Sequence, residues 1–473
     1  MSPRRLVTVL LLTILAGVAQ AAPAPSTATE GDTLHLTLAQ AVARALASGA
    51  DMQVARAGLG VAEGRVREAT ADALPQIKGV VSYNHKFDSI FRGLSGADTS
   101  GIGKLFSDTP FGAEHGWSVD LTATQMLWTS GRVGAGLQAA RAVRRSATAD
   151  RDQTAADVTL AVHEAYWNAL AARQVVDIAQ YGRDQAREHL RQVEAYRRQG
   201  SRSEYDLLQA QVDAANQEPP LVAARSQAQL ALLQLKRALG LPLDRPLALD
   251  SPLAFGETLP VAVEYAADAA ARPAVLGADA LVEARRAGLR AEQAGRWPQL
   301  SASAAVSHQA FPADGTPTRE QFHRSIDATL RLEWPLFQGF RTFGSVQRAR
   351  NELDQARALR DERRQIAEVE LAQARLGVDE ALATLVARRG TARLAARAYQ
   401  LAEVRWRNGL STQLEVSDAR LQMQNAQVAE VLAVKDYRLS LARLTRAAGR
   451  PVTTQERAFE SLTTDLPSPR EDR

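Results

Sequence analysis

Cysteine is absent from all 473 residues, which excludes disulfide bonds, cysteine-ligated metal sites and a lipid-modified cysteine. Long apolar runs are missing as well. Beyond the N-terminus, no stretch reaches the ~18 consecutive apolar residues of a membrane-spanning helix, so a bundle of transmembrane helices is excluded. Excess charge of one sign is also scarce: the formal net charge is +4, and Arg alternates with Glu and Asp in helical stretches. Such alternation is typical of solvated helix faces, and nucleic-acid binding is not expected.

Motifs for catalysis or cofactor binding are missing too. The stretch HEAYW begins at His163, but Trp167 stands where a zinc-binding HExxH motif has its second histidine. We interpret His163 as a residue of a helical seam. The seven histidines are scattered, and no Ser/His/Asp arrangement or phosphate-binding loop is legible. The sequence therefore predicts a protein that is not an enzyme, with no cofactor and no metal site.

The N-terminus has the pattern of a secretory signal peptide. Arg4 and Arg5 precede an apolar run from Leu6 to Val18, and small residues follow around Ala21. We assign residues 1–21 to this signal and expect an exported protein.

An internal duplication determines the architecture. The stretch QMLWTSGRVGAGLQAAR (125–141) matches WPLFQGFRTFGSVQRAR (334–350) at an offset of 209 residues, and the same offset pairs Gly200 with Gly409 and Gly240 with Gly449. Upstream, LPQI (74–77) matches WPQL (297–300) at an offset of 223, so the first copy holds a longer Gly/Ser-rich loop within residues 89–112. Two copies of one unit follow, at residues 22–254 and 255–450, with a tail at 451–473.

Each unit is predicted to contain a helix, a β-hairpin, a very long helix and a shorter return helix. In the first copy these are expected at 38–74, about 76–128, 134–199 and 203–239; in the second the last three are expected at about 299–335, 343–408 and 412–448. Pro219 and Pro220 should kink the first return helix or mark its first turn after a break.

Small and aliphatic residues recur in the long helices at alternating steps of three and four. They are Val162, Ala165, Ala169, Ala172 and Val176, with Leu371, Ala374, Val378, Ala381 and Leu385 in the second copy. This is the pattern of a coiled-coil seam whose helices approach closely. A helix from 134 to 199 would be about 100 Å long.

Apolar and polar side chains alternate from Ile326 to Trp334 and, in the first copy, from Trp117 to Thr122, whereas the partner stretches IKGVVSYNH and LSASAAVSH show a weaker pattern. Four strands cannot close a barrel, and we find no other sheet-forming stretch to cover their apolar faces or edges. Three chains with four strands each would form a closed twelve-stranded barrel, within the size range of outer-membrane barrels. The alternative is a soluble periplasmic coiled-coil adaptor or scaffold protein built from the same helices.

The chain resembles the TolC-like outer-membrane efflux protein family over essentially its whole mature length. The resemblance rests on the duplicated unit, on LPQI/WPQL before the strands and LW…GR/LF…FR after them, and on the turns YRRQGSRSEYDLLQAQ and RWRNGLSTQLEVSDARL. It implies a homotrimer with a twelve-stranded β-barrel in outer-membrane lipid, continuous with a long periplasmic α-helical barrel. It also implies an exit duct that docks onto a periplasmic adaptor protein and an inner-membrane pump, with the substrate chosen mainly by the pump.

Gly200 and Gly409 mark the far tips of the long helices, where the resemblance places the entrance of the duct. Each glycine can serve as a left-handed helix cap, and each tip can also contact the adaptor. We expect the exposed tip residues to make this contact, namely Gly200, Ser203, Gly409, Ser411 and Thr412.

Carboxylates follow both tips. Thr412 with Glu415, and Ser203 with Asp206, have the spacing of capping boxes. Asp418 lies one turn beyond Glu415, and its counterpart in the first copy is Gln209, so capping does not require it. The resemblance implies that Glu415 and Asp418 form an acidic ring at the entrance. Family members can lock the entrance with an arginine where this chain has Ser411; Trp406, Asp206 and Arg202 are our candidates for a different lock.

Overall fold

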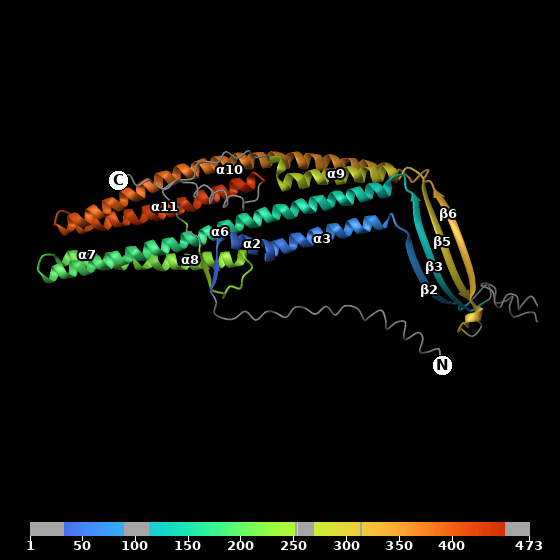
Figure 1. The fold of residues 1–473 in the computed structure, drawn as a ribbon, viewed down its shortest axis with the longest axis horizontal. Helices are drawn as coiled ribbons and strands as arrows, with labels where there is room; N and C mark the ends of the chain where they lie inside the picture. The colour runs from blue at the N-terminus through green and yellow to red at the C-terminus, as the bar shows by residue number, and fades with distance from the viewer. Residues whose placement is uncertain (1–32, 89–112, 251–252, 254–268, 313–314, 450–473) are drawn as a thin grey trace, which may run out of the picture.

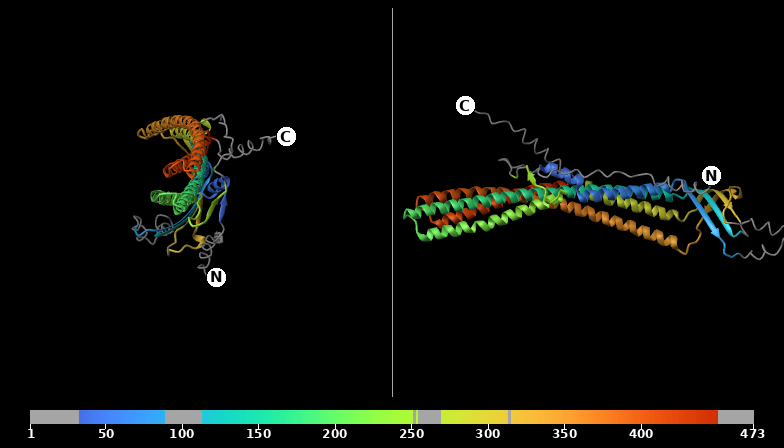
Figure 2. Two further views of the ribbon diagram at one scale, coloured as in Figure 1. Left: turned by 90° about the vertical axis from the view of Figure 1, so that its left-hand side faces the viewer. Right: turned by 90° about the horizontal axis from the view of Figure 1, so that it is seen from below.

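The computed structural model describes residues 33–88, 113–250, 253, 269–312 and 315–449. The signal peptide, the 89–112 loop and the 451–473 tail lie outside the described residues. The protein is a long rod of nearly parallel helices with a four-stranded sheet at one end (Figure 1). Seen along the rod, the helices lie on a curved wall (Figure 2). It is thus mainly α-helical, with a small β part.

The helices of the first repeat are α2 (Leu38–Ser48), α3 (Ala50–Ala71), α6 (Arg132–Arg198), α7 (Glu204–Asn216) and α8 (Glu218–Ala238). The prediction of one continuous opening helix was wrong. Gly49 is extended, with ψ 143°, and it ends α2 and starts α3. The predicted return helix is divided into α7 and α8 at Gln217. Pro219 and Pro220 therefore lie in the first turn of α8, which is the second of the two outcomes expected from the sequence.

The second repeat contains α9 (Pro273–Ala294), α10 (Arg341–Arg407) and α11 (Gln413–Ala447). Helices α6 and α10 have 67 residues each, and both start two residues before the predicted position and end one residue before it. Helix α11 has 35 residues and runs without a break, because no proline interrupts it. Within the described residues, no helix combines the length and the apolar character needed to cross a membrane.

The four long strands form one antiparallel sheet in the order β2-β3-β5-β6. They are β2 (Gln76–His85), β3 (His115–Trp128), β5 (Gln299–Ala310) and β6 (His323–Glu333). Ala302 lies opposite Leu330 and Val306 opposite Ile326, so the apolar residues of neighbouring strands share a face. On the other face Asp120 accepts hydrogen bonds from Ser118 and Ser307 at 2.7 and 2.5 Å. The alternation expected between Ile326 and Trp334 is present through Glu333.

A second sheet was missed by sequence reasoning. Two three-residue strands, β1 (Leu34–Leu36) and β4 (Leu247–Leu249), pair in parallel halfway along the rod. They are too short to show an alternation pattern. Two short 3-10 helices, η1 (Ala269–Ala271) and η2 (Arg319–Gln321), complete the described elements.

The largest apolar cluster lies in the middle of the rod. Val162 and Ala169 of α6 are buried there with Leu371, Val378 and Leu385 of α10, while their alanine neighbours on the predicted seam are partly buried. Val176 is half-buried. Small side chains let the helices pack closely along this seam.

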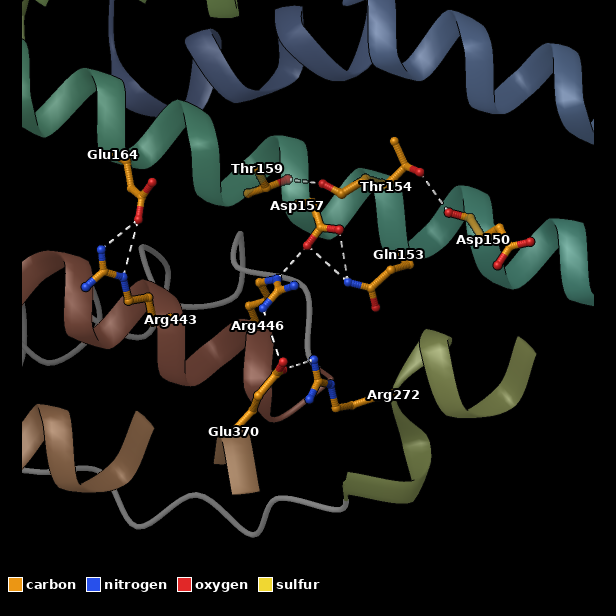
Figure 3. Close-up of polar contacts among 11 residues, drawn as sticks. Asp150, Gln153, Thr154, Asp157, Thr159, Glu164, Arg272, Glu370, Arg443 and Arg446 are labelled. Atoms are coloured by element: carbon orange, nitrogen blue, oxygen red, sulfur yellow. Dashed lines mark hydrogen bonds and ion pairs between the residues drawn. The ribbon is translucent and has the colours of Figure 1, made fainter. Parts of the chain in front are cut away.

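An ion-pair cluster lies beside this core and joins three helices to the start of α9 (Figure 3). Glu164 of α6 pairs with Arg443 of α11 at 2.8 Å, and Asp157 pairs with Arg446 at 2.6 Å. Figure 3 also shows Glu370 of α10 between Arg446 and Arg272, at 3.8 and 2.6 Å.

Candidate functional site at the helix tips

The two tips of the rod are Schellman turns centred on glycines. Gly200 donates to Arg197 O and Ser201 donates to Tyr196 O, at 2.8 and 3.0 Å. Gly409 and Leu410 make the equivalent bonds at 3.0 and 2.8 Å. The φ angles of the two glycines are +76° and +73°, in the left-handed region that glycine adopts at low cost. Both turns therefore have the left-handed caps expected from the sequence.

The helices that leave the two tips are capped differently. Ser203 and Asp206 form a complete capping box, because each side chain accepts a hydrogen bond from the other residue's backbone N–H, at 3.1 and 3.0 Å. Thr412 accepts from the N–H of Glu415 at 3.3 Å, but the Glu415 carboxylate binds Ser411 Oγ at 2.7 Å instead of returning to Thr412. The prediction of a second capping box was thus wrong in one of its two hydrogen bonds, the bond from the Thr412 N–H to the Glu415 carboxylate.

The tip residues expected to contact an adaptor differ in exposure. Gly200, Ser203, Gly409 and Thr412 are exposed, whereas Ser411 is only 9% exposed, so its description as an exposed residue was wrong. Its hydrogen bond to Glu415 holds it against the chain.

Large apolar side chains at the tips were missed by sequence reasoning. Those of Tyr205, Leu208, Leu410 and Leu414 are 72%, 54%, 69% and 55% exposed. The signal was present in the sequence, because all four lie just after the tip glycines and outside the seam positions.

Both proposed ring residues lie on the exposed side of α11. The buried residues at the start of this helix are Gln413, Val416 and Arg420, and Glu415 and Asp418 fall between them. Asp418 makes no side-chain hydrogen bond or ion pair with any other described residue. The Asp418 carboxylate therefore takes no part in capping α11.

Two of the three lock candidates are in contact. Arg202 Nη2 donates to Trp406 O at 3.2 Å, and the guanidinium carbon lies 4.9 Å from the centre of the indole ring. The α6–α7 turn is thus attached to the end of α10. Asp206, the third candidate, is engaged only with Ser203 in its capping box.

Trp406 is itself a core residue of the tip region. It is 1% exposed and packs with Val193, Tyr399, Val416 and other residues in a second apolar cluster. The His189 ring lies 4.3 Å from it, centre to centre.

A buried polar cluster joins α6, α7 and α11 below the tips, and we call it the distal polar cluster. Its members are His189, Asp213, Gln413, Ser417 and Arg420. Arg420 is 1% exposed and donates to Asp213, which also accepts from Ser417 Oγ at 2.9 Å. His189 binds Gln413 through Nε2. Sequence reasoning missed this cluster, although Gln413 and Arg420 occupy seam positions where apolar residues are usual.

The distal polar cluster is incompletely satisfied. Arg420 Nε and Nη1 and Gln413 Nε2 are buried without a hydrogen-bond partner among the described residues. Burial lowers the pKa of His189, and Arg420 lowers it further, while the bond to Gln413 opposes the shift. Buried donors without partners are costly, so this junction is a weak point between the two helical hairpins.

One protein family matches both repeats. The family model described as outer membrane efflux protein matches residues 41–241 and 267–450, one segment for each repeat. The pyoverdine export outer membrane protein OpmQ of Pseudomonas aeruginosa is 26% identical over 83% of this chain and 80% of its own length. Protein CyaE of Bordetella pertussis is 29% identical over 60% of this chain and 57% of its own length.

Solved structures show the same fold. The outer membrane protein VceC of Vibrio cholerae aligns with a TM-score of 0.70 and 20% identity, over 88% of this chain and 96% of that one. The outer-membrane channel OprN aligns with a TM-score of 0.69 and 20% identity, over 88% and 90%. With both repeats matched by the family model, the chain belongs to the outer membrane efflux protein family.

Proposed function

We propose that the chain is one subunit of a homotrimeric exit duct, whose sheet spans the outer membrane and whose helices extend through the periplasm. Three copies of the sheet form a twelve-stranded barrel, and three copies of the helical wall form a tube that continues it. Substrate passes from an inner-membrane pump, past a periplasmic adaptor and through the tube, to the exterior.

The observation that carries this proposal is the four-stranded sheet. Within the described residues, β2 and β6 each have one strand neighbour, so their outer edges are unpaired. The apolar face is also uncovered: Leu121, Ile326 and Leu330 are 54%, 64% and 67% exposed. Open edges beside an apolar surface are an aggregation hazard in water, and closure in lipid removes both.

The tips are the proposed docking surface for the adaptor. Gly200, Ser203, Gly409 and Thr412 offer exposed backbone and hydroxyl groups, and Tyr205 and Leu410 add apolar area. An interface of this kind has an apolar centre and a polar rim. The match to the efflux family favours this duct over the alternative of a soluble adaptor or scaffold.

We place the gate at the junction between the α6/α7 and α10/α11 hairpins. Arg202 with Trp406, and Arg420 with Asp213, connect the two hairpins within one chain. Opening requires the hairpins to separate, so these contacts favour the closed state. Asp206 bonds to Ser203 in the cap of α7, so we leave it out of the proposed lock.

Glu415 and Asp418 from three chains form the proposed acidic ring. Two charges ~6 Å apart repel by ~0.7 kcal/mol in bulk water and by ~2.8 kcal/mol at an effective dielectric constant of 20. A crowded ring of this kind attracts cations. We therefore expect weak cation selectivity and block by divalent cations in planar bilayers, both reduced in Asp418→Asn. Equal block in the variant and the wild type would rule out the ring.

The duct itself is tested by the native mass of the protein extracted in mild detergent from separated outer membranes. Three chains per particle in that fraction are expected. A monomer or dimer recovered from the periplasm would contradict the shared barrel. It would also rule out the acidic ring and the gate, because both require the assembled duct.

A further inference from the structure

Two histidines face each other at the end of the sheet that is distant from the helices. His85 is the last residue of β2 and His115 the first of β3, and they are direct cross-strand partners. Their rings are stacked with centres 4.7 Å apart, and their Nδ1 atoms lie 3.2 Å apart. The Tyr83 hydroxyl also reaches His115 Nδ1, at 2.8 Å. His115 Nδ1 therefore lies within hydrogen-bonding distance of both the Tyr83 hydroxyl and the second imidazole nitrogen.

The separation of the two nitrogens suits a chelated metal ion. Imidazole nitrogens bind zinc at about 2.0–2.1 Å, and two such bonds with ends 3.2 Å apart enclose an angle of about 99–106°. This lies between the right angle of square-planar or octahedral complexes and the tetrahedral angle. Imidazole pairs suit Zn²⁺, Ni²⁺ and Cu²⁺ rather than Mg²⁺ or Ca²⁺, which prefer oxygen ligands.

Neighbouring residues hold the His115 ring in place. Gly315 lies against the ring face: a Cβ on this residue would be 3.4–3.5 Å from three of the ring atoms. Its φ of +80° is also one that glycine adopts readily. Trp117 Nε1 donates to Gly315 O at 2.9 Å and fixes the segment over the ring. On the other side, the Phe87 ring packs edge-on against His85 at 4.6 Å.

We propose that His85 and His115 form a binding site for one borderline divalent transition-metal ion per chain. In the described part of the chain no third His, Cys, Asp or Glu side chain joins this pair, so the site supplies two protein nitrogens and leaves the other coordination positions of the ion to water. The bound ion links β2 to β3 at their open end, on both sides of the long insertion between them. Rings that are already oriented reduce the entropy lost on metal binding.

The test is a calorimetric titration of the full-length, detergent-extracted protein with Cu²⁺. We expect one site per chain, with affinity at least tenfold weaker in His85→Ala and in His115→Ala. His308→Ala is the matched control, because His308 lies on the same face of the sheet, opposite Val119 rather than another histidine. That variant should bind as the wild type does.

A second measurement does not depend on the folding of the variants. Electron paramagnetic resonance of the wild type with one equivalent of Cu²⁺ should show coupling to two imidazole nitrogens. Spectra without nitrogen coupling, no saturable binding by the wild type, or equal affinity in all three variants would each overturn the site and leave an ordinary hydrogen-bonded histidine pair.

Discussion

At the scale of single residues, the tip region contains a few buried polar groups. Arg420 is almost fully buried, with one carboxylate as its charged partner. An ion pair in such surroundings contributes little net stability, but the loss of one partner leaves an uncompensated charge.

Asp213→Ala should therefore destabilise the protein by about 3 kcal/mol, as judged by thermal unfolding in detergent. Asp418→Ala is the matched control: it removes an exposed carboxylate without a partner and should change stability by less than about 0.5 kcal/mol. Adding Arg420→Met to Asp213→Ala should restore most of the loss. A double variant as unstable as Asp213→Ala would show that the pair is not coupled.

Replacing glycine by alanine should have opposite effects on stability at the tip and inside a long helix. Gly409 and Gly390 both have open space at the position that an alanine Cβ would occupy, but only Gly409 has a positive φ. Gly409→Ala should cost ~1–2 kcal/mol, whereas Gly390→Ala, inside α10, should stabilise by ~0.5–1 kcal/mol. Hydrogen exchange of peptides around residues 390 and 409 would measure both, and similar effects at the two sites would contradict the role of φ.

Part of the tip could be predicted from the sequence, and part could not. A glycine followed three residues later by a hydroxyl residue, Ser203 or Thr412, identifies each turn, because the capping interactions are local. The bond between Ser411 and Glu415 depends on the rotamer of the glutamate. The pairing of Arg420 with Asp213 depends on a contact between segments 207 residues apart. Spacing within one segment indicates neither the choice of rotamer nor a partner in a distant segment.

At the scale of elements, α6 is the central helix of the chain. It packs against the opening helices, α8, α9 and α11. Its residue His163 is half-buried and lies next to the buried seam residue Val162. Burial lowers the pKa of His163 to about 4. In the unfolded chain the pKa of His163 has its ordinary value of 6.5. Between pH 6.5 and pH 4, His163 therefore binds a proton in the unfolded chain but not in the folded chain.

Stability should therefore fall as the pH drops from 6.5 towards 4, by about 2 kcal/mol at pH 5 from His163 alone. His163→Gln keeps a polar side chain of similar size and removes the titration. The difference in melting temperature between pH 7.5 and pH 5 should be smaller in the variant. An identical difference in both proteins would exclude His163 as its source.

Elements differ in how well the sequence defines them. Helices α6 and α10 were placed within two residues at each end, since 67 residues of consistent periodicity average out local exceptions. The break at Gly49 was missed because glycines also occur inside helix α3, where they do not interrupt it. Strands β1 and β4 were missed because three residues cannot show a period.

At the scale of the whole molecule, the proposed barrel assigns different environments to the two faces of the sheet. Leu330 belongs to the apolar face, which would contact lipid, and Thr329 to the polar face, which would line the lumen. Arginine in the middle of a lipid-facing surface costs about 2–4 kcal/mol, whereas substitutions in a lumen mainly change selectivity.

Leu330→Arg should consequently reduce the yield of trimer in outer membranes, and Thr329→Arg should leave it near that of the wild type. Native electrophoresis of detergent extracts would compare them. Equal yields would mean that the apolar face does not contact lipid.

The curved wall of helices also bears on how the protein is made. The helices of one chain form a single curved layer that is open on both faces (Figure 2). In a chain on its own, apolar side chains such as those of Val369, Leu376 and Leu394 are therefore 55%, 69% and 74% exposed. If three chains assemble as proposed, a newly made chain is vulnerable to proteases until it meets two others. Because that encounter depends on concentration, the amount of finished duct should rise more steeply than the rate of synthesis, and a modest fall in expression would remove a disproportionate share of it.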